Sequence, residues 1–255
     1  MRVFPSRTSR CARQTALPLL LIALLAPAVA QAAAWYRVDL EQARISPEAL
    51  TEGPRNFARR EEGGALAPLI VPDRRGSGHA LSVFSRATPE GARADRSEIT
   101  VYSGVAPGRR WFLGLEAFLP GQVPAPQDWQ ILAQCVQPGS GKSPPISLDL
   151  EPDGSVSLIA RSDADGFETL WNGPMPRDRW TGFVLEFEIG EAGFARLWVD
   201  GREVVARHLP LIWREGKPRC VLKTGLYRAP STTYFEMLID NVVLGDDRAS
   251  VLPPK

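Results

Sequence analysis

Hydrophobic and polar residues alternate along most of the chain in short segments. In "RSEITVY" (96–102) and "GFVLEFEIG" (182–190), apolar side chains recur at every second position, which is the period of a half-buried strand. No long segment has the period of a helix, although residues 40–56 are expected to hold one short helical turn. Similar alternation or a β-rich composition predicts further strands at residues 79–84, 110–119, 129–136, 146–152, 155–161, 195–201, 203–208, 220–227 and 235–245.

Turn-forming residues separate these segments. "EPDGS" (151–155) and "VDGRE" (199–203) each contain Asp-Gly, which supplies the positive φ that a tight hairpin turn requires. About a dozen short strands joined by such turns predict an all-β fold, a sandwich of two antiparallel sheets. No internal repeat and no linker divides the chain, so a single domain is expected.

The first 32 residues have the three parts of a secretory signal peptide. A start rich in arginine precedes the apolar run "ALPLLLIALLAPAVA" (16–30), and small residues follow it. The run is shorter than the roughly 20 residues that span a bilayer. We therefore expect residues 1–32 to be removed, and residues 33–255 to form one secreted or periplasmic domain without membrane attachment.

Charge and metal-ligand content exclude several functions. The chain has 30 Lys and Arg residues, four of them within residues 1–32, against 29 Asp and Glu residues. The mature chain is thus net negative, and nucleic acid is not an expected partner. Two histidines and no Cys-x-x-Cys spacing predict no metal cofactor. The acid-rich "SDADGFE" (162–168) could hold a structural calcium ion, but it lacks the ligand spacing of an EF-hand, and a solvated hairpin is preferred. The oligomeric state has no signal in the sequence.

Several strands carry a polar face opposite their apolar one. Arg96 and Glu98 share a side of "RSEIT", Gln134 lies opposite its apolar neighbours in "ILAQCV", and Lys223 and Tyr227 share a side of "VLKTGLYR". A curved sheet would gather these residues in one groove. The alternative interpretation is an ordinary solvated sheet face.

Four blocks of the sequence, in order, resemble a known family. The blocks "DRSEI" (95–99), "WQILAQCV" (129–136), "RWTGFVLEFEIGEAGFARLWVDGREVV" (179–205) and "LKTGLYR" (222–228) are similar to those of polysaccharide lyases related to heparin lyase I and glucuronan lyase. More distantly, they resemble alginate lyases. The resemblance implies a concanavalin-like jelly roll that cleaves an acidic, uronic-acid-containing polysaccharide by β-elimination, without a cofactor.

Such an elimination needs groups of the kinds found on the polar faces. The carboxylate of the uronate must be neutralised before its C5 proton can leave, a role that suits Gln134 and Arg96. One residue can take that proton and return it to the departing O4 if both atoms lie on the same side of the sugar, and Tyr227 is the candidate. Three further charged residues of these motifs are predicted to contact the substrate: Glu98, Lys223 and Arg228.

One position departs from the family pattern. Related lyases often have a histidine two positions after the glutamine, and this chain has Val136 there. Three interpretations remain: Tyr227 works alone, a histidine comes from elsewhere, or the fold has lost its activity. His79 is preferred over His208 as that histidine, because some of these lyases draw theirs from an earlier strand.

Two other functions therefore remain as alternatives. A non-catalytic carbohydrate-binding protein would keep the fold without the chemistry. A glycoside hydrolase is less favoured, because "EFEIGE" (186–191) lacks the paired-carboxylate spacing of jelly-roll hydrolases. Cys135 and Cys220 are both predicted to lie on the sheet face opposite the groove residues. Cys135 directly follows Gln134, and Cys220 precedes Tyr227 on the same strand. The two cysteines form a disulfide if their Cα atoms lie within about 7 Å, or they are two free buried thiols.

Overall fold

The computed structural model describes residues 36–252, apart from 39, 42, 46–48, 53, 54 and 77. Nearly all regular structure in these residues is antiparallel strand, with one 3-10 helix at Ala249–Val251. No helix among them is long and apolar enough to cross a membrane. The predicted signal peptide, residues 1–32, lies outside the described residues, so it stays a prediction.

The first sheet has eight strands. Its members are β1 (Tyr36–Val38), β5 (Ala65–Pro72), β6 (His79–Ser85), β8 (Trp111–Phe118), β13 (Trp180–Glu188), β14 (Phe194–Val199), β15 (Arg202–His208) and β17 (Phe235–Gly245). The strand order is β15-β14-β13-β8-β17-β6-β5, and β1 pairs with β17.

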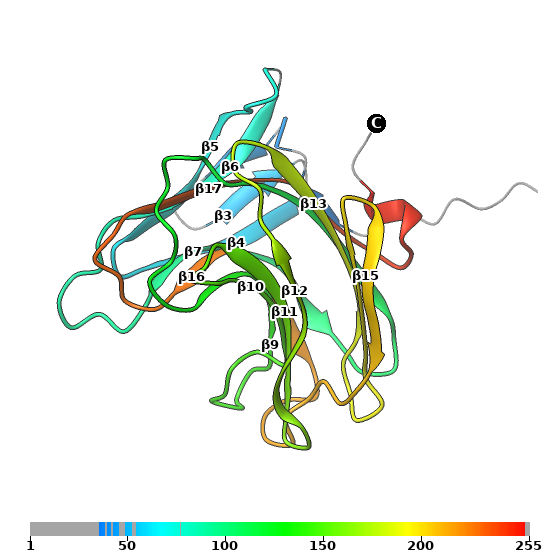
Figure 1. The fold of residues 1–255 in the computed structure, drawn as a ribbon. Helices are drawn as coiled ribbons and strands as arrows, with labels where there is room; N and C mark the ends of the chain where they lie inside the picture. The colour runs from blue at the N-terminus through cyan, green and yellow to red at the C-terminus, as the bar shows by residue number, and fades with distance from the viewer. Residues whose placement is uncertain are drawn as a thin grey trace, which may run out of the picture. The chain divides into compact units, whose positions relative to one another are not determined.

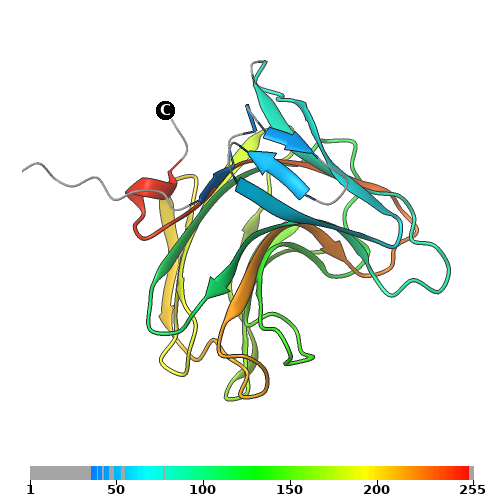
Figure 2. The ribbon, with the colours of Figure 1, turned by 180° about the vertical axis from the view of Figure 1, so that it is seen from behind.

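The second sheet has nine strands among the described residues. Its members are β2 (Ala43–Ile45), β3 (Ala49–Glu52), β4 (Arg55–Glu62), β7 (Asp95–Val105), β9 (Gln130–Val136), β10 (Ile146–Leu150), β11 (Ser155–Ser162), β12 (Gly166–Pro174) and β16 (Cys220–Arg228). The order is β12-β11-β10-β9-β16-β7-β4-β3-β2. Figures 1 and 2 show from opposite sides that the strands of this sheet curve along their length.

One hydrophobic core lies between the two sheets. Leu113 and Phe187 of the first sheet belong to the same buried cluster as Leu148 and Leu222 of the second. Along β10 and β16, every second side chain points into this core. The alternate side chains lie on the other face of the nine-stranded sheet. This arrangement confirms the predicted jelly-roll sandwich of two antiparallel sheets.

The local predictions had mixed success. The hairpin turn between β14 and β15 is confirmed, with φ of 49° at Asp200 and 79° at Gly201. The described residues of 40–56 form no helical turn, contrary to expectation: β2 and β3 pair in succession onto β4 and extend the sheet. Strand pairing over a distance overrides local helix propensity there. The sequence pattern also missed β1, β4, β5 and β12, which pair with β17, β7, β6 and β11.

The two mature cysteines are joined. Cys135 on β9 and Cys220 on β16 form a disulfide with a Cα–Cα distance of 5.4 Å, and both are buried. Of the two interpretations left open by the sequence, the bonded one is confirmed. The bond closes a loop between residues 85 positions apart, which stabilises a fold by roughly 4 kcal/mol in the chain-entropy description. It also joins the two strands that carry Gln134 and Tyr227.

Candidate active site

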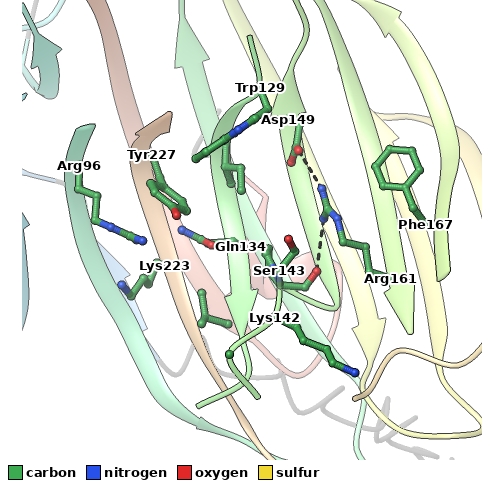
Figure 3. Close-up of a pocket in the computed structure, with 14 residues that line it drawn as sticks. Arg96, Trp129, Gln134, Lys142, Ser143, Asp149, Arg161, Phe167, Lys223 and Tyr227 are labelled. Atoms are coloured by element: carbon green, nitrogen blue, oxygen red, sulfur yellow. Dashed lines mark hydrogen bonds and ion pairs between the residues drawn. The ribbon is translucent and has the colours of Figure 1, made fainter. Parts of the chain in front are cut away.

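A cavity of about 540 Å³ opens on the face of the nine-stranded sheet that does not pack on the core. Its walls come from β7, β16, β9, β10, β11 and β12, together with residues 141–144 (Figure 3). These six strands are neighbours in the sheet, and each contributes at least one side chain to the cavity lining. Four of the residues singled out in the sequence line it: Arg96, Gln134, Lys223 and Tyr227.

Strand register arranges the lining in rows. Arg96 pairs with Tyr227, Tyr227 with Ile131, and Ile131 with Asp149, so these residues form one row across four strands. Directly paired residues of antiparallel strands point to the same face, which brings all four side chains to the cavity.

A second row lies beside the first. Lys223 pairs with Gln134, and Gln134 pairs with Ser147. On β16, Gly225 lies between the two rows with φ of 138°, and the pairing with β9 shifts register here. A Cβ atom at this position would overlap the carbonyl oxygen of Ser97, so only glycine permits the close approach of β16 to β7.

The buried carboxylate of Glu98 bonds to three polar side chains that line the cavity. Its side chain is 2 % exposed and accepts hydrogen bonds from the amide of Gln134, from Arg96 Nη1 at 3.1 Å and from Lys223 Nζ at 3.4 Å. A buried carboxylate bonded to two cations and an amide holds all three in fixed orientation. Glu98 was expected to contact substrate directly, but the structure places it behind the residues that line the cavity.

The ring of Tyr227 is held between two side chains. The Arg96 guanidinium carbon lies 3.4 Å from the ring centroid, and the Trp129 ring meets it edge-on with centroids 4.8 Å apart. Arg96 Nε also donates to Glu62 Oε2 at 2.9 Å, which fixes the guanidinium over the phenol. Figure 3 shows Tyr227, Gln134 and Lys223 on the same side of the cavity.

The chain is similar to known proteins in sequence pattern and in fold. A family model described as polysaccharide lyase matches residues 33–243. The chain belongs to the polysaccharide lyase family. No curated protein matches its sequence significantly.

Solved structures show that this polysaccharide lyase shares its fold with other lyases. An endo-β-1,4-glucuronan lyase from the fungus Trichoderma reesei is 15% identical, with a TM-score of 0.64 over 86% of this chain and 98% of that one. An alginate lyase is 13% identical, with a TM-score of 0.53 over 70% of this chain and 78% of that one. The receptor-binding domain of botulinum neurotoxin type G, 9% identical, gives 0.51 over 86% and 49%. These similarities concern the fold alone.

The lyase brings neither of its two histidines to the cavity. His79 lies at the start of β6 in the other sheet, where its Nδ1 is 3.4 Å from Glu41 Oε2. His208 ends β15 and packs against Phe194. Among the described residues that line the cavity, Val136 occupies the position where the family resemblance led us to expect a histidine. The expectation that His79 supplies that group therefore has no support from the geometry.

Arg228, expected to bind substrate, lies on the opposite face of β16 from the cavity. It is 3 % exposed and donates from Nε to Asp95 Oδ2 at 2.9 Å and from Nη2 to Ser85 Oγ at 3.1 Å. Burial alone would raise the pKa of Asp95, but hydrogen bonds from the Gly64 N–H, from Ser85, from Thr88 and from Arg228 lower it below its usual value. Arg228 is thus part of a closed structural ion pair.

The cavity contains a second polar group, which was not predicted from the sequence. Arg161 donates from Nη2 to Asp149 Oδ2 at 3.2 Å and from Nη1 to Ser147 Oγ at 2.8 Å. Burial raises the pKa of Asp149, although the charge of Arg161 and hydrogen bonds oppose this rise. In "ISLDL" (146–150), Ser147 and Asp149 alternate with core residues, so the same pattern that singled out Gln134 would have found them.

No metal centre is found in the part of the chain that the structure describes. No group of three or more His, Cys, Asp or Glu residues there could hold an ion. The acid-rich "SDADGFE" (162–168) forms the turn between β11 and β12. Within it, Asp163 accepts hydrogen bonds from Lys142 Nζ and from the backbone N–H of Arg214.

Proposed function

We propose that this polysaccharide lyase is exported and cleaves a uronic-acid-containing polysaccharide by β-elimination in the cavity on the nine-stranded sheet. The observation that carries the proposal is the convergence of Arg96, Gln134, Lys223 and Tyr227 on one cavity. Support for export comes from the sequence pattern of residues 1–32.

The donors around Glu98 suit the carboxylate of a uronate. A proton next to a charged carboxylate is hard to remove, because the product would carry two negative charges. The Gln134 amide has a second N–H besides the one bonded to Glu98, and the Arg96 guanidinium has five N–H groups. Fixed donors of this kind stabilise the charge that develops on the carboxylate during proton removal, a contribution of several kcal/mol in enzymes generally.

Tyr227 is the group that moves the proton. As the phenolate, it takes the C5 proton; the C–H electron pair forms the C4–C5 double bond, and the C4–O4 bond breaks. The departing O4 then takes the proton from the phenol, which restores the phenolate. Arg96 and Trp129 fix the ring, so the hydroxyl stays at the cavity throughout. Because neither histidine reaches the site, the proposal assigns both transfers to Tyr227.

The test is an activity screen of the mature protein on glucuronan, alginate, heparinoids and pectate. The product of β-elimination has a double bond conjugated to a carboxylate, so it absorbs ultraviolet light. We expect such absorbance to rise with at least one polyuronate and to disappear with Tyr227→Phe. Tyr234→Phe is the matched control, because Tyr234 is exposed and donates to the Gln122 carbonyl outside the cavity. New reducing ends without ultraviolet absorbance would overturn the proposal.

A further inference from the structure

The cavity has a second cationic group at its other end, and this group is rigidly held. The Arg161 side chain is 11% exposed and lines the cavity. Its guanidinium donates to Ser147 Oγ, to Asp149 Oδ2 and to the Pro144 carbonyl oxygen at 2.8, 3.2 and 3.3 Å. Three partners from β10 and the preceding loop therefore fix its orientation before any ligand arrives.

An exposed aromatic ring lies beside this arginine. Phe167 on β12 pairs directly with Arg161 on β11, and the guanidinium carbon lies 5.3 Å from its ring centroid. Phe167 is 63 % exposed, the highest value among the large hydrophobic residues exposed in the described part of the chain. A flat ring open to solvent at the edge of a polar cavity can cover the apolar face of a sugar.

The spacing between the two ends fits a polymer that lies across the strands. Arg161 bonds to residues of β10, and two strand intervals separate β10 from β16, which carries Tyr227. At about 4.8 Å per interval, the distance is roughly 10 Å. One pyranose unit is about as long as one interval. Figure 3 shows Arg96 and Tyr227 at one end of the cavity and Arg161 and Phe167 at the other.

We propose that Arg161 and Phe167 form a second subsite, which binds the carboxylate and the ring of another uronate in the same chain, two residues from the uronate that loses its proton. Asp149 is a positioning residue for the guanidinium of Arg161. The inference rests on the proposed function and narrows its substrate class: the enzyme acts on chains with uronates in succession, rather than on chains with isolated uronates.

The test compares how activity and binding depend on oligouronate length. We expect Phe167→Ala and Arg161→Gln each to lower the ratio of kcat/KM for a hexasaccharide to that for a disaccharide about tenfold or more, the usual size of one charge-assisted or stacking contact. Phe167 is exposed, so its truncation leaves folding intact. Arg207→Gln is the matched control, because Arg207 is exposed and pairs with Glu168 outside the cavity.

Binding separates failure of this inference from failure of the proposed function. Calorimetry with the Tyr227→Phe protein measures affinity for the same oligouronates without cleavage. We expect affinity to rise from disaccharide to hexasaccharide, and this rise to vanish when Phe167→Ala is added. An unchanged length dependence in both variants overturns the subsite. Binding that depends on length without any ultraviolet-absorbing product from the wild type supports the subsite and contradicts the elimination.

Discussion

Two neighbouring pairs of residues on β7 and β16 lie on opposite faces of the sheet. Arg96 pairs with Tyr227, and one position away Asp95 pairs with Arg228. The first pair stacks at the cavity, with the guanidinium carbon 3.4 Å from the ring centroid. The second is an ion pair with exposures of 0 % and 3 %. One step along a strand changes the face, and with it the role of the side chain.

The two carboxylates of β7 show the same contrast. Asp95 accepts from groups that are themselves inside the fold, including the Gly64 N–H at 2.6 Å and Ser85 Oγ at 2.7 Å. Glu98 accepts from side chains that reach the cavity, among them Gln134. Asp95 therefore bonds groups of the scaffold, whereas Glu98 bonds donors that line the cavity.

The largest effect on catalysis is expected at the Arg96–Tyr227 pair, which lines the cavity. Tyr227→Phe removes the proton-transfer group, which contributes about 10²–10⁴-fold in enzymes, so we expect kcat to fall about 10³-fold. Stability should change by less than about 1 kcal/mol, because the ring keeps its contacts with Arg96 and Trp129. Product absorbance and urea unfolding measure the two quantities. A large loss of stability without loss of kcat would show that Tyr227 stabilises the fold and does not transfer the proton.

The next effect is on stability, at the buried pair. Asp95→Asn leaves the charge of Arg228 buried without a carboxylate, which costs about 3–5 kcal/mol in comparable buried pairs. Urea unfolding at neutral pH measures the change, and kcat per folded molecule should stay near that of the wild type. Wild-type stability at neutral pH in this variant would show that the pair is not structural.

The pH dependence of this difference follows from the pKa of Asp95. That pKa is lower in the folded state than the unfolded value, so the folded state binds fewer protons in this range. The contribution of Asp95 is complete above about pH 4 and is lost as the pH falls through the folded pKa. The stability gap between wild type and Asp95→Asn should therefore narrow below about pH 4.

A smaller effect is expected when the carboxylate beneath the cavity is neutralised. Glu98→Gln keeps the shape of the side chain but weakens its bonds to Arg96 and Lys223. Because a small displacement of catalytic groups lowers the rate of an enzyme about 10²-fold, we expect kcat/KM to fall by about that factor. Glu62→Gln is the matched control, since Glu62 also binds Arg96 but is far more exposed. Equal losses in the two variants would contradict a special role of Glu98.

The smallest effect is expected from a carboxylate on the other sheet. Burial raises the pKa of Asp240 to about 6, despite a bond from the Asn241 N–H and the charge of Arg75. A raised pKa means that the folded state holds the proton more tightly, so this group reduces stability as the pH rises from about 4 to 6. The melting temperature of Asp240→Asn should therefore rise relative to that of the wild type as the pH increases across that range. A constant difference would contradict the shift.

Alternation along single strands predicted the cavity residues correctly as a shared face. Arg96, Gln134, Lys223 and Tyr227 each lie opposite core residues, and that information is local. Arg228 was included because it belongs to the motif, although its position in the alternation places it on the other face. Which strands lie side by side is not local information, because β10 reaches the cavity through pairing with β9, and β11 through pairing with β10.

The same reason explains the failure at the edge of the sheet. The backbone of residues 43–45 and 49–52 is extended because each segment pairs with a neighbour, and the last neighbour, β4, pairs with β7 far along the chain. No single segment carries that information, so a local turn was predicted instead.

One measurement tests the central claim most directly: the ultraviolet absorbance and the reducing ends released together when the mature protein acts on a polyuronate, in parallel with Tyr227→Phe. We predict that the wild type produces one unsaturated end for each new reducing end, and that the variant produces almost none of either. Reducing ends without the unsaturated product, or full activity in the variant, would contradict elimination by Tyr227.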